Sequence, residues 1–470
     1  MSAETSDGAV RDHGICLSGG GHRATVFGWG ALLALADAGL HRRTLSISSV
    51  SGGSIANGAV MIGPDYGTSE PGEIEDHLTA LVRAVASRGV LLGGAPATRS
   101  YLRSLIAALG VAAAGLIVII VAAVVSSGWW MLIGAVVLAL ASVVAWKLFA
   151  RRSVVTERAI DTELLGGGHT TLAELAARHL SINHVICTTE LQSGVSCYFG
   201  NRLVYGWQFG GTTAPPALAL STPVQASACV TGLFRPRAVP LSDLHLDGHK
   251  PPKIDDVVLV DGGVYDNMAD EWEYGFESRS TWKPLAAAQA RRASRLVVVN
   301  ASAGWDDLDP ASTSGFGLSS PDCVARRACS TTSRRRIAAE PCSPCSGRPR
   351  RTRRPDRPES SSRSATVRTG SRLGSLREGR APFDDRGRWA LEALAFLDAR
   401  GLSEADWNVR AAESAGVATT LAPLGAKRCA DLLEHAYFLT AANLHVLFGN
   451  GITGPAPSRE RFERMAGMSA

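Results

Sequence analysis

Residues 44–53 read TLSISSVSGG, and this stretch indicates both the fold class and a candidate reactive residue. Its first seven residues are rich in serine and β-branched side chains, which predicts a strand, and the glycines at 52 and 53 turn the chain into a helix. A serine on such an elbow has its hydroxyl held clear of the backbone, because small neighbours let strand and helix pack closely. Ser51 is therefore the candidate nucleophile.

The elbow departs in one position from the usual Gly-x-Ser-x-Gly pattern, since Ser49 stands where the first glycine is expected. Serine is small, so we expect some local crowding and no loss of the elbow. A second register, GGSIA at 52–56, would make Ser54 the nucleophile, but it lies inside the helix and lacks the final glycine. A glycine-rich turn with incidental serines is the alternative to either register.

The preceding part of the chain repeats the same order of elements. Residues 14–17 form a short apolar strand, residues 18–23 (SGGGHR) a turn, and residues 23–38 an apolar helix. This strand–helix–strand–helix order predicts an α/β fold with a largely parallel sheet covered by helices. Further strands are expected at 184–188, 257–260 and 296–299, and C-terminal helices around 389–397 and 432–444.

The SGGGHR turn lets backbone N–H groups converge at a helix N-terminus, which suits an anion. A nucleotide phosphate and the oxyanion of an acyl-transfer intermediate are the two candidates. The chain lacks the G-x-x-x-x-G-K-[ST] pattern, and Ala24 falls where G-x-G-x-x-G needs its third glycine. We therefore favour an oxyanion hole built from the amides of Gly19, Gly20 and Gly21.

A base is needed to activate the serine, and Asp261 is the candidate. It ends the apolar stretch VVLV and precedes two glycines that turn the chain. A carboxylate partly withdrawn from water at a strand end can have a raised pKa and serve as a base, although a turn aspartate is the alternative. His435 and His445 fit the chain order of a Ser–acid–His triad, but both lie in apolar helical stretches where histidine is usually a core residue.

An apolar run without charged residues extends from 104 to 146, which is too long for one membrane crossing and long enough for two. We expect a transmembrane hairpin over 104–149, with helices near 104–125 and 129–149 and an interfacial Trp pair at 129 and 130. Four cations flank the run on one side of such a hairpin, which places that side in the cytoplasm: Arg103, Lys147, Arg151 and Arg152. A buried helical hairpin in a soluble core is the alternative.

The formal net charge of +5 on 470 residues comes from one segment. Residues 321–380 hold sixteen Arg and five acidic residues, so this tract carries +11 and the remainder −6. The basic balance therefore gives little support for a nucleic-acid partner. Only Cys342 and Cys345 make a C-x-x-C pair, so no zinc site is expected. Arginine without lysine, with Ser, Pro and Cys, suggests a compensated frameshift or a disordered tract.

Taken in order, GGGHR at 19–23, SVSGG at 49–53 and DGG at 261–263 resemble the motifs of the patatin-like phospholipase family. The resemblance covers roughly residues 12–63 and 182–300, with weaker support from SACVTGLF at 227–234. It implies a three-layer α/β/α sandwich, a Ser–Asp dyad without a catalytic histidine, and hydrolysis of acyl esters in lipids without a cofactor or metal.

Carried over by position, the resemblance makes Ser51 the nucleophile, Asp261 its base and the amides of residues 19–21 the oxyanion hole. Arg23 would steady that loop or bind a lipid phosphate. Three glycines would support the site: Gly53, Gly262 and Gly263.

These expectations divide the chain into a catalytic domain at 12–100 and 152–310, the hairpin at 104–149, the tract at 321–380 and a helical segment at 387–470. Because Ser51 precedes the hairpin and Asp261 follows it, a shared site requires an even number of crossings. The sequence thus predicts a lipid hydrolase anchored by two crossings on the cytoplasmic side. A catalytically impaired membrane scaffold and an acyltransferase using the same dyad are the alternatives.

Overall fold

The computed structural model describes residues 10–91, 94–246, 255–279, 292–302, 365–367 and 385–468. Within these residues, one mixed sheet of ten strands runs in the order β10-β9-β1-β2-β3-β4-β5-β6, with β8 paired to the end of β3 and β7 paired to β8. The strands are β1 His13–Leu17, β2 Thr44–Ser49, β3 Asn183–Glu190, β4 Val195–Gly200, β5 Val204–Gly206, β6 Gly210–Thr212, β7 Arg237–Pro240, β8 Asp256–Val260, β9 Arg295–Val299 and β10 Ala365–Val367.

The sheet is parallel in one half and antiparallel in the other. All pairs from β10 through β9, β1 and β2 to β3 are parallel. From β3 onward the pairs are antiparallel, because β3 to β6 are joined by short connections that reverse the chain. The expected strands at 14–17, 44–50, 184–188, 257–260 and 296–299 are confirmed, and the antiparallel strands β4 to β7 were not expected.

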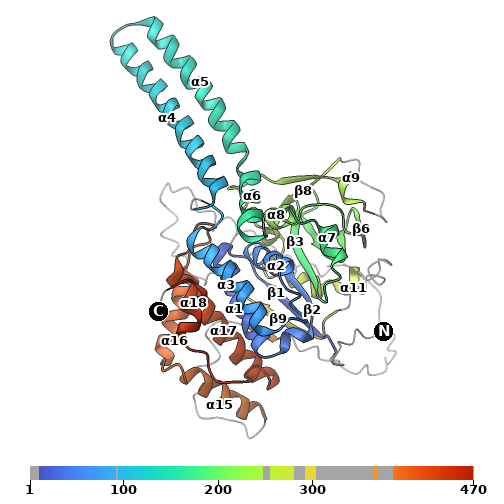
Figure 1. Cartoon of the computed structure of the whole chain (residues 1–470). Helices are drawn as coiled ribbons and strands as arrows, with labels where there is room; N and C mark the ends of the chain where they lie inside the picture. Colours follow the sequence, from blue (N-terminus) through green and yellow to red (C-terminus); the bar gives the residue numbers. More distant parts are fainter. Residues whose placement is uncertain are drawn as a thin grey trace, which may run out of the picture.

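Long helices cover one face of the parallel half (Figure 1). They include α1 Gly21–Asp37, α2 Gly52–Ile62, α3 Pro71–Ser87 and α17 Ala426–Phe448. Helix α1 is apolar on all sides because it is enclosed by α2, α3 and α17 as well as by the sheet. Ile15 and Leu17 of β1 join this large core, whereas Cys16 between them faces the opposite side.

The opposite face carries shorter elements within the described residues. These are the 3-10 helix η2 Gly262–Val264 and the helices α10 Glu271–Tyr274 and α11 Phe276–Arg279. Trp272 of α10 packs there against Tyr198 of β4. The second helical layer of an α/β/α sandwich is therefore thin where the structure describes it.

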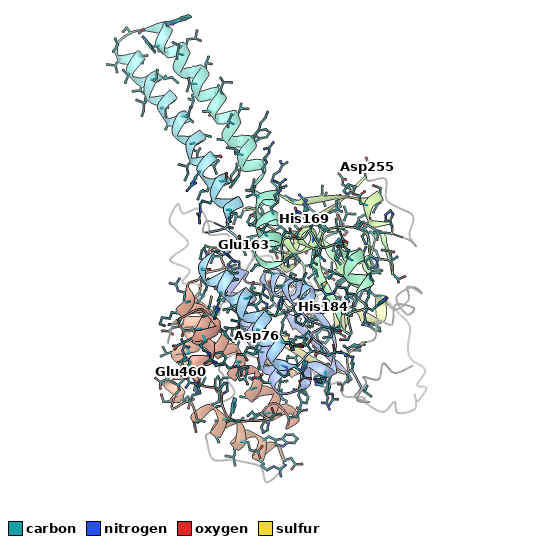
Figure 2. All side chains as sticks on the ribbon, viewed as in Figure 1. Asp76, Glu163, His169, His184, Asp255 and Glu460 are labelled. Atoms are coloured by element: carbon teal, nitrogen blue, oxygen red, sulfur yellow. The ribbon has the colours of Figure 1, made fainter. Side chains whose placement is uncertain are left out.

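Helices α4 Pro96–Val124 and α5 Gly128–Ala150 form an antiparallel hairpin that projects from the domain (Figure 1). Both are long and apolar enough to cross a membrane, over 98–124 and 128–150. Their side chains extend outward along the whole projection (Figure 2), and Trp129 at the far end is 70% exposed. The hairpin expected at 104–149 is thus present as two helices, and the first begins eight residues earlier than expected.

The C-terminal helices pack beside α1 and α3 (Figure 1). They confirm the helices expected around 389–397 and 432–444. One buried carboxylate, Glu434, accepts hydrogen bonds from Arg400, Arg410 and Arg459 and ties these helices together. The remaining helices are η1 Leu40–Arg43, α6 Arg152–Leu164, α7 Leu172–Ala177, α8 Ser221–Ser227, α9 Leu241–Leu244, α15 Asp385–Asp398, α16 Glu404–Gly416 and α18 Arg459–Met465.

The arginine-rich tract at 321–380 lies outside the described residues except for β10, whose backbone pairs with β9 at the edge of the sheet. Cys342 and Cys345 are not among the described residues. The hypothesis of a compensated frameshift stays a prediction.

Candidate active site

Ser51 occupies a strained position between β2 and α2. Its backbone dihedral angles are φ 51° and ψ −121°, a positive φ that side-chain-bearing residues rarely adopt. Such a conformation costs on the order of 1–3 kcal/mol and persists only where the surrounding structure enforces it. The side chain is 6% exposed. These angles mark Ser51, and not Ser54 inside α2, as the residue presented by the elbow.

A buried hydroxyl network holds this strained residue in place. The Ser51 N–H donates to the Ser227 Oγ over 3.0 Å, and the Ser227 hydroxyl donates to the Cys187 carbonyl over 2.6 Å. Ser54 adds its own hydroxyl, 2.8 Å from the Ser227 Oγ. Ser227 ends α8 and begins the SACVTGLF segment, so that segment supports the elbow through this hydroxyl.

The unusual Ser49 belongs to the same interior. Its hydroxyl donates to the Val185 carbonyl over 3.1 Å and accepts from the Asn57 side-chain amide over 2.9 Å. Asn57 in turn accepts from His184 Nδ1 over 2.7 Å, and burial lowers the pKa of His184 to about 3, so this ring is neutral. His184 projects from β3 (Figure 2). Because its hydroxyl is fully hydrogen-bonded, Ser49 fits where the usual elbow has glycine.

Asp261 follows β8, and its carboxyl group interacts with the Ser51 side chain, although 209 residues separate the two in the chain. Its Oδ1 accepts from the Gly263 N–H over 2.8 Å. Burial raises the pKa of Asp261 to about 7, while hydrogen bonds from Gly263 and from the Ser51 side chain lower it. Gly262 packs against the Cys187 carbonyl and lets the chain turn directly beneath the elbow. The structure therefore brings together a serine hydroxyl and a carboxyl group that titrates near neutrality.

The glycine turn lies beside the elbow. A methyl group at Gly52 would lie 2.0 Å from the Gly21 carbonyl oxygen, so only glycine permits this contact. The Gly19 N–H donates to the Asn267 carbonyl over 3.0 Å. No backbone carbonyl among the described residues accepts from the N–H of Gly20 or Gly21. Of the three expected donors, Gly19 instead anchors the turn to Asn267, and the oxyanion role expected for Gly20 and Gly21 stays a prediction.

Arg23 is buried, and its guanidinium lies beside the glycine turn, where a methyl group at Gly20 would be 3.1 Å from it. Its guanidinium donates to the carbonyl of Ala301 over 2.9 Å and to those of Ala415 and Val417. At 4% exposure, this geometry favours steadying the glycine turn over binding a lipid phosphate. Gly53, another expected supporting residue, lies in the first turn of α2 against the Leu17 carbonyl.

The two C-terminal histidines are engaged elsewhere. His435 Nδ1 lies 2.9 Å from the Ser414 Oγ, and His445 Nε2 lies 2.7 Å from Glu392. Their described hydrogen bonds thus stay within the C-terminal helices and the loop after them. The described part of the chain also holds no group of three or more His, Cys, Asp or Glu side chains that could bind a metal ion.

Several supporting residues could not be found from motifs alone. Asn267 lies six residues beyond Asp261, and its carbonyl takes the Gly19 amide. Asn57, His184 and Ser227 contribute through contacts between distant segments. The only sequence signal for any of them is the small-residue stretch at 227–234.

The family model described as patatin-like phospholipase matches residues 15–269, a stretch that contains the glycine turn, the elbow, the hairpin and Asp261. The chain belongs to the patatin-like phospholipase family. Membership supports a lipid hydrolase in general, and the patatin fold accounts for the mixed sheet, which is parallel from β10 to β3. The matched region of this patatin-like phospholipase ends before β9 and the C-terminal helices.

Two solved structures resemble the chain at low sequence identity. Human GIVD cytosolic phospholipase A2 is 14% identical, with a TM-score of 0.43, and the match covers 97% of this chain and 60% of the human one. VipD from Legionella pneumophila is 15% identical, with a TM-score of 0.26, over 57% of this chain and 49% of the other. The chain thus spans about three fifths of the human enzyme's length. No curated protein sequence gives a significant match.

Proposed function

We propose that this patatin-like phospholipase is a membrane-anchored serine acyl hydrolase that cleaves acyl esters of lipids through Ser51 and Asp261. The observation that carries the proposal is a strained elbow serine whose side chain interacts with a buried carboxyl group of raised pKa. Perturbed carboxyl groups beside a nucleophile are typical of catalytic sites.

In the first half-reaction, the Asp261 carboxylate takes the proton of the Ser51 hydroxyl as Oγ forms a bond to the ester carbonyl carbon. The carbonyl oxygen becomes an oxyanion, which the N–H groups of Gly20 and Gly21 stabilise. Collapse of this intermediate breaks the bond to the alcohol half of the substrate. Asp261 returns the proton to the departing alkoxide, and an acyl ester remains on Ser51.

In the second half-reaction, water attacks the acyl carbon and gives its proton to Asp261. The Ser51 Oγ–carbon bond breaks, the proton returns to Ser51, and the fatty acid leaves. Each step uses groups of this chain and water, so the proposed reaction needs neither a metal nor another cofactor.

The α4–α5 hairpin would anchor the enzyme by crossing the bilayer twice. Only 11% and 17% of the most apolar windows of its two helices are buried, so most of their surface is available to lipid. The four flanking cations lie at the end nearest the domain, which by the positive-inside bias is cytoplasmic. Ser51 and Asp261 then share one side of the membrane.

The base of the hairpin is connected to the segment that supports the elbow. Arg152, the first residue of α6, stacks over the Phe149 ring at 3.9 Å and donates to the Leu233 carbonyl. Leu233 belongs to the 227–234 segment, whose first residue holds the Ser51 amide. This connection would keep the site close to the lipid surface and raise the local concentration of substrate.

Labelling with a fluorophosphonate probe in detergent micelles tests the nucleophile. Wild-type protein should be labelled, and Ser51→Ala should not, while Ser54→Ala serves as the neighbouring serine control. Absence of labelling in the wild type, or equal labelling of Ser51→Ala, contradicts the mechanism and favours a catalytically impaired scaffold. Product analysis over a panel of lipids, with and without an added alcohol, then separates hydrolysis from acyl transfer.

A further inference from the structure

The glycine turn makes contacts with a part of the chain that lies outside the family-matched region. Residues 415–425, which we name the C-terminal strap, comprise the last two residues of α16 and the connection to α17, and they run directly over the first turn of α1. The His22 N–H donates to the Thr420 carbonyl over 2.8 Å. A methyl group at Gly21 would lie 2.6 Å from the same carbonyl oxygen, so the two backbones are in direct contact.

Two side chains of the turn reinforce this backbone contact. His22 is fully buried, and its Nδ1 lies 3.0 Å from the Ala422 carbonyl. Burial lowers the pKa of His22 to about 4, so the ring is neutral at physiological pH. Because a carbonyl can only accept, Nδ1 carries the hydrogen. Arg23 adds its hydrogen bonds to the carbonyls of Ala415 and Val417.

The strap itself is fixed on its other side, so it can serve as a rigid support. The Leu421 carbonyl accepts from the N–H groups of Val90 and Leu91, and the Leu424 N–H donates to the Val85 carbonyl. Within the strap, the Thr420 hydroxyl accepts from the Ala422 N–H over 3.0 Å and closes a tight turn. The glycine turn therefore rests on a segment that is held against the end of α3.

From these contacts we infer that the C-terminal strap positions the oxyanion hole, and that His22 and Arg23 are the positioning residues through which it acts. The inference rests on the proposed function. The peptide groups of Gly20 and Gly21 come immediately before His22, so fixing the His22 amide and ring sets the direction of their N–H groups. Donors aimed in advance at the developing charge contribute to rate only when they are held in that direction.

Kinetics on a soluble p-nitrophenyl ester in detergent micelles test the inference. We expect His22→Leu to lower kcat by about ten- to a hundredfold, the cost typical of a misplaced group, with KM within about twofold. His22→Asn should recover most of the loss, because its side-chain amide can donate from nearly the position of Nδ1. Thr420→Val, which removes the hydroxyl that closes the turn of the strap, should lower kcat in the same direction by a smaller factor.

The control is His41→Leu, because His41 is also buried and lies 3.1 Å from a backbone carbonyl, that of Ser69, but does not contact the turn. It should lower thermal stability and leave kcat per folded molecule unchanged. The inference is overturned if His22→Leu and wild type have equal kcat. It is also overturned if His22→Asn has the melting temperature of wild type but does not recover kcat.

Hydrogen–deuterium exchange separates this inference from the proposed function. His22→Leu should speed exchange of the amides at 19–24 relative to wild type and to His41→Leu, whether or not the protein hydrolyses the ester. If wild type is inactive, the proposed function fails and exchange alone decides whether the strap holds the turn. Unchanged exchange at 19–24 in His22→Leu counts against the strap in either case.

Discussion

The Asp261 carboxyl group lies in the interior beside Ser51, and burial is the largest cause of its raised pKa of about 7. The proposed base acts only in its ionised form, so ionisation of Asp261 would also set the pH at which the site works. Hydrogen bonds from Gly263 and from the Ser51 side chain lower the pKa that burial raises. The carboxyl group is therefore partly ionised near neutral pH.

The first prediction concerns activity against pH. The kcat/KM of wild type should rise with pH, with a midpoint near 7 set by ionisation of Asp261 in the free enzyme, and then level off. Initial rates on a soluble ester between pH 5 and 9 give the curve. A flat profile, or a midpoint near the ordinary value of an aspartate, means that Asp261 is not the base.

A second prediction concerns stability at the same residue. Unfolding exposes Asp261 and restores its ordinary, lower pKa, so the folded state binds the proton more tightly. The stabilising contribution of the neutral carboxyl is therefore complete below the unfolded pKa and is lost as pH rises to about 7. Asp261→Asn, which stays neutral, should melt at a higher temperature than wild type at pH 8.

Thermal denaturation at pH 4 and pH 8 measures this difference, which should shrink at the lower pH. Asp256→Asn is the matched control, because Asp256 begins β8, the strand that Asp261 follows, but is exposed. A pH-independent difference at Asp261, or an equal effect at Asp256, contradicts the assignment of a buried carboxyl of raised pKa.

At the scale of elements, the sequence predicts the parallel strands and the helix after each, because long apolar runs bounded by glycine turns carry a strong local signal. The antiparallel strands β5 and β6 have three residues each, too few for an alternating pattern to be visible. The glycine turn and the elbow could be identified from motifs. Their supports, Ser227 and the strap, could not, because hydrogen bonds between segments more than 170 residues apart leave no local pattern.

The close packing of α1 on α17 yields a third prediction, with a matched pair of glycines on one helix. A methyl group at Gly30 would lie 2.6 Å from the Leu433 carbonyl oxygen, whereas one at Gly28 meets its nearest atom at 3.5 Å. Gly30→Ala should destabilise the fold by about 1–3 kcal/mol through overpacking. Gly28→Ala should be neutral or stabilise by up to about 1 kcal/mol, because alanine favours helix. Urea denaturation of both variants measures the free energies of unfolding.

If Gly30→Ala and Gly28→Ala have the same free energy of unfolding, the backbone of α17 does not pack against Gly30 as closely as described. That result would also weaken the support that the strap receives, since α17 begins where the strap ends.

At the scale of the whole molecule, the proposed function gives the hairpin and the domain separate tasks, which leads to a fourth prediction. Replacing residues 104–146 by a short Gly-Ser loop should leave kcat on a soluble ester within about threefold of wild type, because no described contact of Ser51 or Asp261 involves the hairpin. The same variant should no longer float with phosphatidylcholine vesicles, since it loses the apolar surface that the bilayer would cover.

Vesicle flotation and ester hydrolysis are measured on the same preparations of wild type and variant. Retained flotation would indicate that another surface binds lipid. A loss of soluble-ester hydrolysis in a well-folded variant would show that the hairpin does more than anchor the domain.

The two consecutive carbonyls of Thr420 and Leu421 join three stretches of chain, since one accepts from His22 and the other from Val90 and Leu91. A gene fragment trimmed to the family-matched residues 15–269 would leave these amides without acceptors. The truncation would also uncover the faces of α1 and α3 on which α17 packs, and apolar surface exposed to water costs about 25 cal/mol per Å². The unit that can be expressed, evolved or recombined as one piece therefore extends at least to residue 425, well beyond the segment by which its family is recognised.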